Sequence, residues 1–242
     1  MLDGLYSTQA RPSEVPGTRE AALEHLKAFT ASGYGRRNFV DAPTSRLSAY
    51  LRHGVLSITE VADHLRRVAT GRERDEFLKQ LSWREFFNLV LEQEGDGALE
   101  NLENPKYAVR WATELPDDVR DADTGLPCVD AWVTRLVETG YMHNHERLWF
   151  AAYLTHFRRV DWKAGWAFFR EHLLDGDIAS NALSWQWVAS TFSNKPYFMN
   201  QENIAKYSGN RWCNDCEAAC PFRKSYERLE RELFGGSHGW SA

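Results

Sequence analysis

Apolar side chains recur every three or four residues along most of this chain, which is the spacing of one face of an α-helix. The segment 73–94 shows this spacing best, and the glycine-containing run EQEGDG then supplies a stop. Its apolar stripe consists of Phe77, Leu81, Phe86, Phe87, Val90 and Leu91. Alternating strand patterns are scarce, and no unit has the order strand, crossover helix, strand. The sequence therefore predicts an all-α fold.

The chain has 242 residues, of which 43% are hydrophobic, so it can bury a substantial core. We interpret residues 1–242 as one domain. Helical spacing also covers residues 23–29, 47–55, 61–68, 129–157 and 162–174. The remaining segments are an irregular lead-in at 1–18, a polar loop at 112–127, a cysteine-containing segment at 205–234 and a tail at 235–242.

Charge and hydropathy limit the partners and the compartment. The net charge of −5 gives no overall basic balance, so any DNA contact must come from a local patch. No apolar run reaches the ~18 residues that span a bilayer, and the first residues lack the basic-then-apolar order of a signal peptide. We therefore expect a cytoplasmic monomer that does not contact a membrane.

The four cysteines form a recognisable set. Cys213, Cys216 and Cys220 have the spacing C-x2-C-x3-C before Pro-Phe, and Cys128 is remote in sequence. In the cytoplasm such residues are free thiols or metal ligands more often than disulfides. Three close thiolates and a remote one can ligate a [4Fe-4S] cluster, because each iron takes one cysteine. Zinc could use the same four ligands, so both metals remain open.

Seven motifs follow one another along residues 34–200. They are YGRRNF, TSRLSAYLRHGVLS, FLKQLSWREFF, GLPCVDAW, GYMHNHERL, DWKAGW and LLDGDIASNALSWQWVAS. In this order the chain resembles the helical FAD-binding domain of the photolyase and cryptochrome family. Members of that family usually begin with an α/β antenna domain, and this chain begins where that domain would end. The resemblance implies the all-α FAD-binding domain without the N-terminal antenna domain.

The resemblance implies a set of FAD-binding residues. The turn Thr44–Ser48 offers hydroxyls, amide N–H groups and a guanidinium to the two phosphates of FAD, although an ordinary N-cap at Thr44 or Ser45 explains the same spacing. Near the isoalloxazine, Arg147 would pair with Asp175. The alternative for Asp175 and Asp177 is helix capping. The full implied set is Tyr34, Thr44, Ser45, Arg46, Leu47, Ser48, Gln80, Arg84, Asn144, Arg147, Asp175, Asp177 and Asn181.

The residues implied to face a DNA lesion depart from the family pattern at one position. Enzymes that repair cyclobutane dimers typically have Glu where this chain has Gln80. Gln also occurs there in enzymes for (6-4) photoproducts, but those carry a His pair where this chain has Asn144 and Leu148. The lesion class therefore stays open. The implied lesion-facing residues are Gln80, Trp83, Arg84, Asn144 and Trp187.

Two further sets follow from the resemblance. Trp185, Trp162 and Trp111 would relay electrons from the surface to the flavin, although buried Trp rings are more often core filler. The cysteines resemble those of iron–sulfur bacterial cryptochromes and photolyases, in which a remote cysteine before GY-x-H completes the set. Cys128 occupies that place. The loop before the last Cys-Pro-Phe is shorter in this chain than in those proteins.

The function implied is light-driven repair of UV-damaged DNA, with reduced FAD donating an electron to a flipped-out pyrimidine dimer. The alternatives are (6-4) photoproduct repair, a cryptochrome-like blue-light photoreceptor, and an electron carrier with flavin and an iron–sulfur cluster. All share the same cofactor pocket, so the sequence does not separate them. Basic residues that could contact DNA phosphates are Arg36, Arg37, Arg46, Arg52, Arg66, Arg67, Arg158, Arg159 and Lys163.

Overall fold

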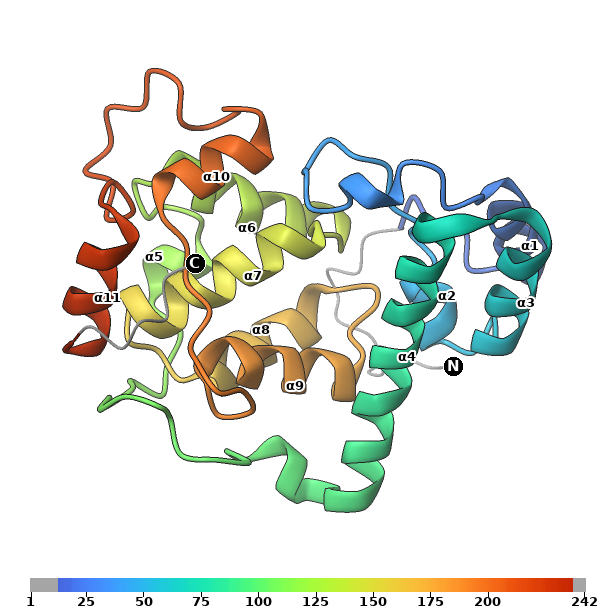
Figure 1. Ribbon diagram of the computed structural model, residues 1–242. Coiled ribbons are helices and arrows are strands. Elements are labelled where there is room, and N and C mark those ends of the chain that lie inside the picture. The colour runs from blue at the N-terminus through green and yellow to red at the C-terminus, as the bar shows by residue number, and fades with distance from the viewer. Residues whose placement is uncertain (1–12, 237–242) are drawn as a thin grey trace, which may run out of the picture.

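The computed structural model describes residues 13–236, and the regular elements in that range are helical (Figure 1). Strand pairing within it is limited to an isolated bridge between Ala112 and Val160. The all-α prediction is therefore confirmed. The parts of the predicted lead-in and tail at residues 1–12 and 237–242 lie outside the described residues. The elements are α1 Arg19–Ala28, η1 Tyr34–Arg36, α2 Ser48–Arg52, α3 Ile58–Val68, α4 Gly71–Glu94, η2 Gly95–Leu99, α5 Asp117–Arg120, α6 Pro127–Thr139, α7 Asn144–Ala152, η3 Tyr153–Phe157, α8 Trp162–His172, α9 Ile178–Ala189, α10 Gln201–Ser208 and α11 Tyr226–Phe234.

The first helices pack against the N-terminal part of α4 (Figure 1). Helix α3 starts where it does because Ser57 and Glu60 form a capping box, in which the Ser57 hydroxyl accepts from the Glu60 N–H at 3.1 Å. Its apolar face then meets Phe77 and Leu81 of α4. The shared buried residues are Leu26, Leu47, Tyr50, Leu56, Val61, Leu65, Phe77 and Leu81.

A larger core lies between α6, α7, α8 and α9. It contains four fully buried tryptophans, Trp132, Trp149, Trp162 and Trp185, together with phenylalanine rings. Close approach of α8 and α9 depends on Gly165, because a Cβ at this position would lie less than 3.0 Å from the ring of Trp185. The Trp185 ring instead packs edge-on against Phe169, with 5.1 Å between ring centroids.

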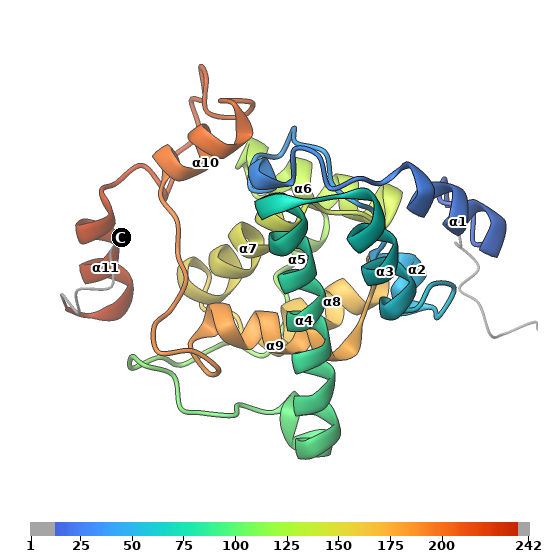
Figure 2. The same cartoon turned by 45° about the vertical axis from the view of Figure 1, so that its right-hand side comes forward.

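Helix α4 joins the two regions. Figure 1 and Figure 2 both show it passing beside α9, and the two helices are in contact. This crossing brings residues around Gln80 and Arg84 next to the start of α9, about a hundred residues later in the sequence. The crossing is what positions the site described below.

Three details differ from the predicted helices. The segment 129–157 is interrupted, because Gly140 adopts φ +67° and ends α6, and α7 starts at Asn144. The helix predicted at 47–55 is limited to Ser48–Arg52. Phe86 is 42% exposed rather than part of a buried stripe, and its ring stacks on Phe192 of the segment after α9. Within residues 13–236, no helix combines the length and apolar character needed to cross a bilayer.

Gly165→Ala is expected to lower the free energy of unfolding by about 1–2 kcal/mol. Overpacking costs ~1–3 kcal/mol, which exceeds the ~1 kcal/mol that Ala gains over Gly inside a helix. Urea denaturation followed by circular dichroism measures the difference. Gly97→Ala is the matched control, because its added Cβ would have its nearest neighbour at 4.0 Å. A Gly165→Ala protein as stable as the wild type would contradict the packing argument.

Candidate functional site

A cavity of about 290 Å³ lies where α4, α7, α9 and the turn before α2 meet. Its walls combine polar side chains with an apolar surface. Twelve residues of the predicted site line it, which are Tyr34, Ser45, Ser48, Gln80, Trp83, Arg84, Asn144, Arg147, Asp175, Asp177, Asn181 and Trp185. The structure therefore brings most of the predicted FAD-binding residues into one wall.

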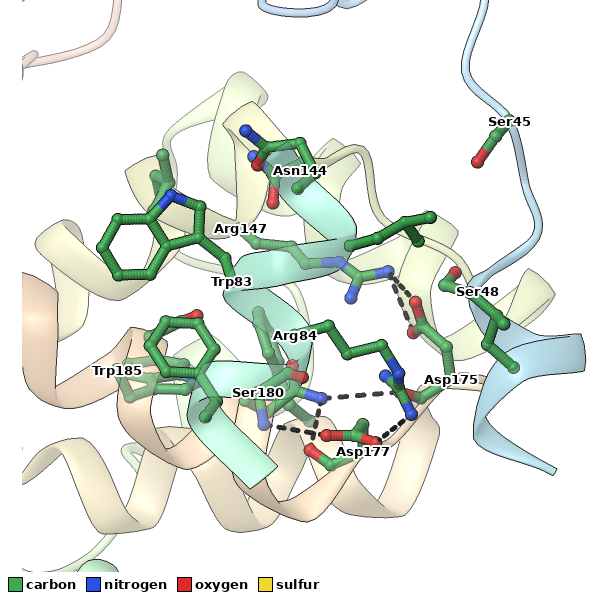
Figure 3. A pocket seen from close by; sticks show the side chains of 18 of the residues that line it. Ser45, Ser48, Trp83, Arg84, Asn144, Arg147, Asp175, Asp177, Ser180 and Trp185 are labelled. Atoms are coloured by element: carbon green, nitrogen blue, oxygen red, sulfur yellow. Dashed lines mark hydrogen bonds and ion pairs between the residues drawn. The ribbon is translucent and has the colours of Figure 1, made fainter. Parts of the chain in front are cut away.

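Two arginine–aspartate pairs cross the cavity floor (Figure 3). Arg147 Nη2 lies 3.0 Å and 3.1 Å from the two carboxylate oxygens of Asp175. Arg84 Nη2 lies 2.6 Å from Asp177 Oδ2, with 18% and 8% of the two side chains exposed. Burial would raise the pKa of Asp175, but Arg147 and the Ser48 hydroxyl outweigh it and hold that pKa below the usual carboxyl range. Asp175 therefore stays ionised at neutral pH.

Asp177 caps the start of helix α9 and also lines the cavity. Its Oδ1 accepts from the Ser180 N–H at 2.8 Å and thereby caps α9, while Oδ2 receives Arg84. One turn on, the Asn181 amide nitrogen donates to the Asp177 carbonyl at 2.8 Å. Because a carbonyl can only accept, that bond assigns Nδ2 as the donor and leaves Asn181 Oδ1 as an acceptor in the cavity wall.

Helix α7 presents Asn144 at the cavity because His143 fixes the start of the helix. The His143 N–H donates to Glu146 Oε2 at 3.1 Å, and its Nδ1 accepts from the His145 N–H at 3.2 Å. Glu146 is fully buried and paired with Arg135. Burial lowers the pKa of His143 to about 4, so this ring is neutral at physiological pH. His145 bonds to the Asn38 carbonyl at 2.6 Å, so both histidines have structural partners.

The Ser/Thr-rich turn divides into two parts. Ser45 and Ser48 line the cavity, and the Ser45 hydroxyl accepts from the Leu47 N–H at 3.3 Å. The Thr44 hydroxyl contacts the Tyr141 hydroxyl at 3.2 Å, and the Arg46 guanidinium lies 3.9 Å from the centre of that ring. In the described part of the chain, Thr44, Arg46 and Leu47 do not line the cavity wall. Leu47 is the N-cap of α2, without a side-chain bond.

Aromatic rings surround the outer edge of the cavity. Trp83 is 47% exposed and contacts Phe86, with 5.6 Å between ring centroids. Phe86 stacks on Phe192 at 6.2 Å. Trp187 is 42% exposed and packs on Tyr197 at 5.5 Å, outside the cavity wall as far as the structure describes it.

The three predicted relay tryptophans lie on three different segments of the chain. Trp185 lines it, and Trp162 is fully buried on the adjoining helix α8, where its indole N–H donates to Asn101 Oδ1 at 2.7 Å. Trp111 is half-buried. Trp111 and Trp162 lie next to the isolated bridge between Ala112 and Val160. In this bridge the Ala112 N–H donates to the Arg159 carbonyl, and the Asp161 N–H donates to the Ala112 carbonyl, each at 2.8 Å.

The four cysteines lie on the opposite side of the larger core. Cys128, on α6, is buried, and Cys213 and Cys220 pack against the same cluster of apolar residues. Burial and the nearby thiols of Cys220 and Cys213 raise the pKa of Cys128 to about 12, so these sulfurs are neighbours. Among residues 13–236, however, no three His, Cys, Asp or Glu side chains are close enough to share one metal ion.

Sequence reasoning missed the apolar wall of the cavity and two serines. Stepping along the helix faces that carry Arg84 and Asn181 would have found half of these residues, because positions three or four apart share a face. Ser180 Oγ and Trp185 Nε1 are buried without a partner within the described protein. The missed lining residues are Leu51, Phe77, Leu81, Phe87, Leu148, Ala151, Phe169, Ser180, Ser184 and Val188.

Comparison with curated proteins finds photolyases. The chain is 37% identical over 194 residues to a deoxyribodipyrimidine photo-lyase of Halobacterium salinarum, covering 74% of this chain and 40% of that protein. It is also 37% identical over 160 residues to that of Streptomyces griseus, covering 65% and 34%. The chain thus spans about two fifths or less of the length of these two relatives.

Solved structures agree with this result. A class III photolyase of Agrobacterium tumefaciens has a TM-score of 0.67 at 29% identity, and a cryptochrome of Synechocystis has a TM-score of 0.71 at 25%. Each comparison covers 79% of this chain and 43% of the other. The family described as the FAD binding domain of DNA photolyase matches residues 77–222. These residues include α4, α7, α8 and α9, which build the cavity, so the chain belongs to the family of the FAD-binding domain of DNA photolyase.

Proposed function

We propose that this chain binds FAD in the cavity and acts as a light-driven DNA repair flavoenzyme. The observation that carries the proposal is the arrangement of the cavity, with charged and amide groups on its floor and the exposed Trp83 ring in its wall. A flavin needs the polar groups for its hydrogen bonds, and an unstacked base needs an aromatic ring on which to stack. Reduced FAD, when bound, supplies the light absorption and the electron that splits a pyrimidine lesion.

The residues present fit FAD. Ser180 Oγ and Trp185 Nε1 lack partners within the described protein, so a ligand with hydrogen-bonding groups would satisfy them. Asn181 Oδ1 is an acceptor, which suits the N–H at N5 of a reduced isoalloxazine ring. Arg147, Asp175, Asp177 and Arg84 would hold the ring edge. For the pyrophosphate we propose the turn of Thr44, Ser45, Arg46, Leu47 and Ser48, of which Ser45 and Ser48 line the cavity. We propose Tyr34, Gln80 and Asn144 as further FAD-binding residues.

On the substrate side, an extruded base would enter past Trp83 and Asn144. Trp83 offers a ring on which a base can stack, and Arg84 and Asn144 supply N–H donors to its polar edge. Gln80 brings an uncharged amide to the same wall. We propose a cyclobutane dimer as the lesion and Trp187 as a further stacking residue. The neutral Gln80 is the feature that favours a cryptochrome-like photoreceptor as the second candidate.

DNA phosphates would be bound by arginines whose charge is not balanced within the protein. Arg158 is held by Asp118 at 2.7 Å, and Lys163 pairs with Glu100. These two basic residues of the predicted patch are therefore less suited to phosphate contact. Arg36 also has a carboxylate near it, because its Nη2 lies 3.9 Å from Asp41 Oδ1. Arg52, on the helix that contributes Leu51 to the cavity, is better placed.

We propose that Trp185, Trp162 and Trp111 carry electrons from the surface to the flavin. Trp185 forms part of the cavity wall, Trp162 lies on the helix packed against it, and Trp111 lies beside a surface hollow. The order of the three positions supports one direction of transfer, from Trp111 inward. The same three positions would serve a photoreceptor, so this relay does not depend on the repair reaction.

We further propose that Cys128, Cys213, Cys216 and Cys220 ligate a [4Fe-4S] cluster. Cys128, Cys213 and Cys220 pack against one cluster of apolar residues, which supports the proposal, and a [4Fe-4S] cluster takes one cysteine for each iron. Four thiols without a disulfide also suit a reducing compartment, so we place the protein in the cytoplasm, as a monomer.

Illumination of the FAD-reduced protein with an oligonucleotide that contains a thymine dimer is expected to restore thymines, measured by chromatography. Trp83→Ala should weaken binding of that oligonucleotide about tenfold, because base stacking contributes ~1–3 kcal/mol. Fluorescence anisotropy measures the affinity. Leu89→Ala, which also removes an exposed apolar side chain of α4, is the control. Intact photoreduction of FAD without light-dependent repair would overturn the repair function and favour the photoreceptor.

Trp162→Phe is expected to slow photoreduction of oxidised FAD at least tenfold, because phenylalanine is much harder to oxidise than tryptophan. The rate of photoreduction is measured from flavin absorption spectra recorded after increasing times of illumination. Trp166→Phe is the matched control, since its ring lies 6.2 Å from Trp162 on the same helix but outside the proposed relay. An unchanged rate in Trp162→Phe would remove this residue from the electron path.

The purified protein is expected to contain iron and acid-labile sulfide in equal amounts, and Cys128→Ser should lose both. Absorption spectra and colorimetric analysis measure them. The substituted serine keeps the approximate size of the side chain but does not supply the thiolate that binds iron. A protein that contains zinc but neither iron nor labile sulfide would refute the cluster and leave a zinc site with the same ligands.

A further inference from the structure

Tyr107 and His156 form a buried hydrogen-bonded pair that neither the cavity nor the tryptophan relay uses. The Tyr107 hydroxyl lies 2.8 Å from His156 Nδ1, and the two residues are 7% and 0% exposed. His156 Nε2 lies 3.0 Å from the Val188 carbonyl, which can only accept. The proton therefore sits on Nε2, Nδ1 is an acceptor, and the Tyr107 hydroxyl is the donor.

A π-helical turn, Tyr153–Phe157, places this pair next to the outer end of the proposed relay. Such turns are rare and are frequent at functional sites. The same turn contributes the Thr155 carbonyl, which accepts from the Trp111 indole N–H at 3.3 Å. One turn thus holds Trp111 through Thr155 and Tyr107 through His156.

The electrostatic setting keeps both groups neutral before any reaction. Burial raises the pKa of the Tyr107 phenol, and the nearby Arg159 guanidinium and Trp111 indole offset only part of that rise. Burial lowers the pKa of His156 to about 3, so the ring is neutral at physiological pH and Nδ1 keeps the lone pair that accepts from Tyr107.

We propose that Tyr107 is a redox-active tyrosine that reduces oxidised Trp111, with His156 Nδ1 as the acceptor of its proton. This inference rests on the proposed electron relay, in which one electron leaves Trp111 toward the photoexcited flavin, the oxidant. Tyr107 then gives one electron to the Trp111 radical cation, its O–H bond breaks, and an N–H bond forms at Nδ1. The products are neutral Trp111, a neutral tyrosyl radical and an imidazolium.

The energetics permit this step despite the low pKa of His156. An oxidised phenol is a far stronger acid than an imidazolium, so the proton transfer remains downhill even in a buried site. The radical oxygen can then accept from the new Nδ1–H, so the pair stays hydrogen-bonded. Return of the electron to Tyr107 requires the proton to move back as well. Return of the electron from the flavin to the tyrosyl radical is therefore slower than its return to the Trp111 radical.

Two variants separate the redox role from a structural one. Tyr107→Phe removes the oxidisable hydroxyl, and His156→Gln keeps a donor for Val188 and an oxygen acceptor for Tyr107 but removes the basic nitrogen. Tyr226→Phe is the matched control, because Tyr226 lies in the same aromatic cluster as Tyr107. Flash photolysis of the FAD-loaded protein in H2O and D2O, with electron paramagnetic resonance, follows each radical.

The wild type and Tyr226→Phe are expected to form a tyrosyl radical, more slowly in D2O. Tyr107→Phe should abolish that radical and shorten the lifetime of the charge-separated state at least tenfold, while Trp185 is still oxidised. His156→Gln should slow tyrosyl formation at least tenfold. Tryptophan radicals with no tyrosyl signal in the wild type would overturn this inference and leave the relay standing. Absence of any photoinduced radical would overturn both.

Discussion

The ion pair between Arg84 and Asp177 joins the two helices, α4 and α9, whose side chains line the cavity. Arg84 lies in the middle of α4, and Asp177 is the N-cap of α9, so one pair fixes where two helices from different parts of the chain meet. Removing one partner of such a pair costs ~3–5 kcal/mol, because the other charge stays buried without compensation. Arg147 and Asp175 repeat the arrangement from α7. The cavity floor is therefore rigid and electrically balanced before any ligand enters.

This constraint explains why polar groups can line a cavity between two apolar cores. Each acidic side chain pairs with an arginine, and Arg147 has a second contact between its Nε and the Met142 carbonyl at 2.9 Å. Asn181 uses its amide nitrogen on the backbone and keeps an oxygen for the cavity. The groups left without partners, Ser180 Oγ and Trp185 Nε1, lie on the wall toward which a ligand would bind.

Local patterns predicted the helices well, because apolar periodicity and the glycine that ends α4 act within a few residues. They failed where tertiary packing decides. The break at Gly140 was hidden by apolar spacing that continues on both sides of it. The motif order selected twelve lining residues, but Thr44 and Arg46 contact Tyr141 instead, a residue distant in sequence. The Tyr107–His156 pair has no local signal, because 49 residues separate its members.

Helix α7 and the π-helical turn after it contact the cavity, the helix that carries Cys128 and the outer end of the proposed relay. One face of α7 carries Asn144, Leu148 and Ala151 to the cavity. The opposite face carries Trp149, whose ring lies 5.5 Å from Trp132 on α6, one turn after Cys128. The π-helical turn then reaches Trp111 and Tyr107 through Thr155 and His156. Because a packed helix moves as a unit, this element fixes the cavity, the cysteines and the outer end of the relay relative to one another.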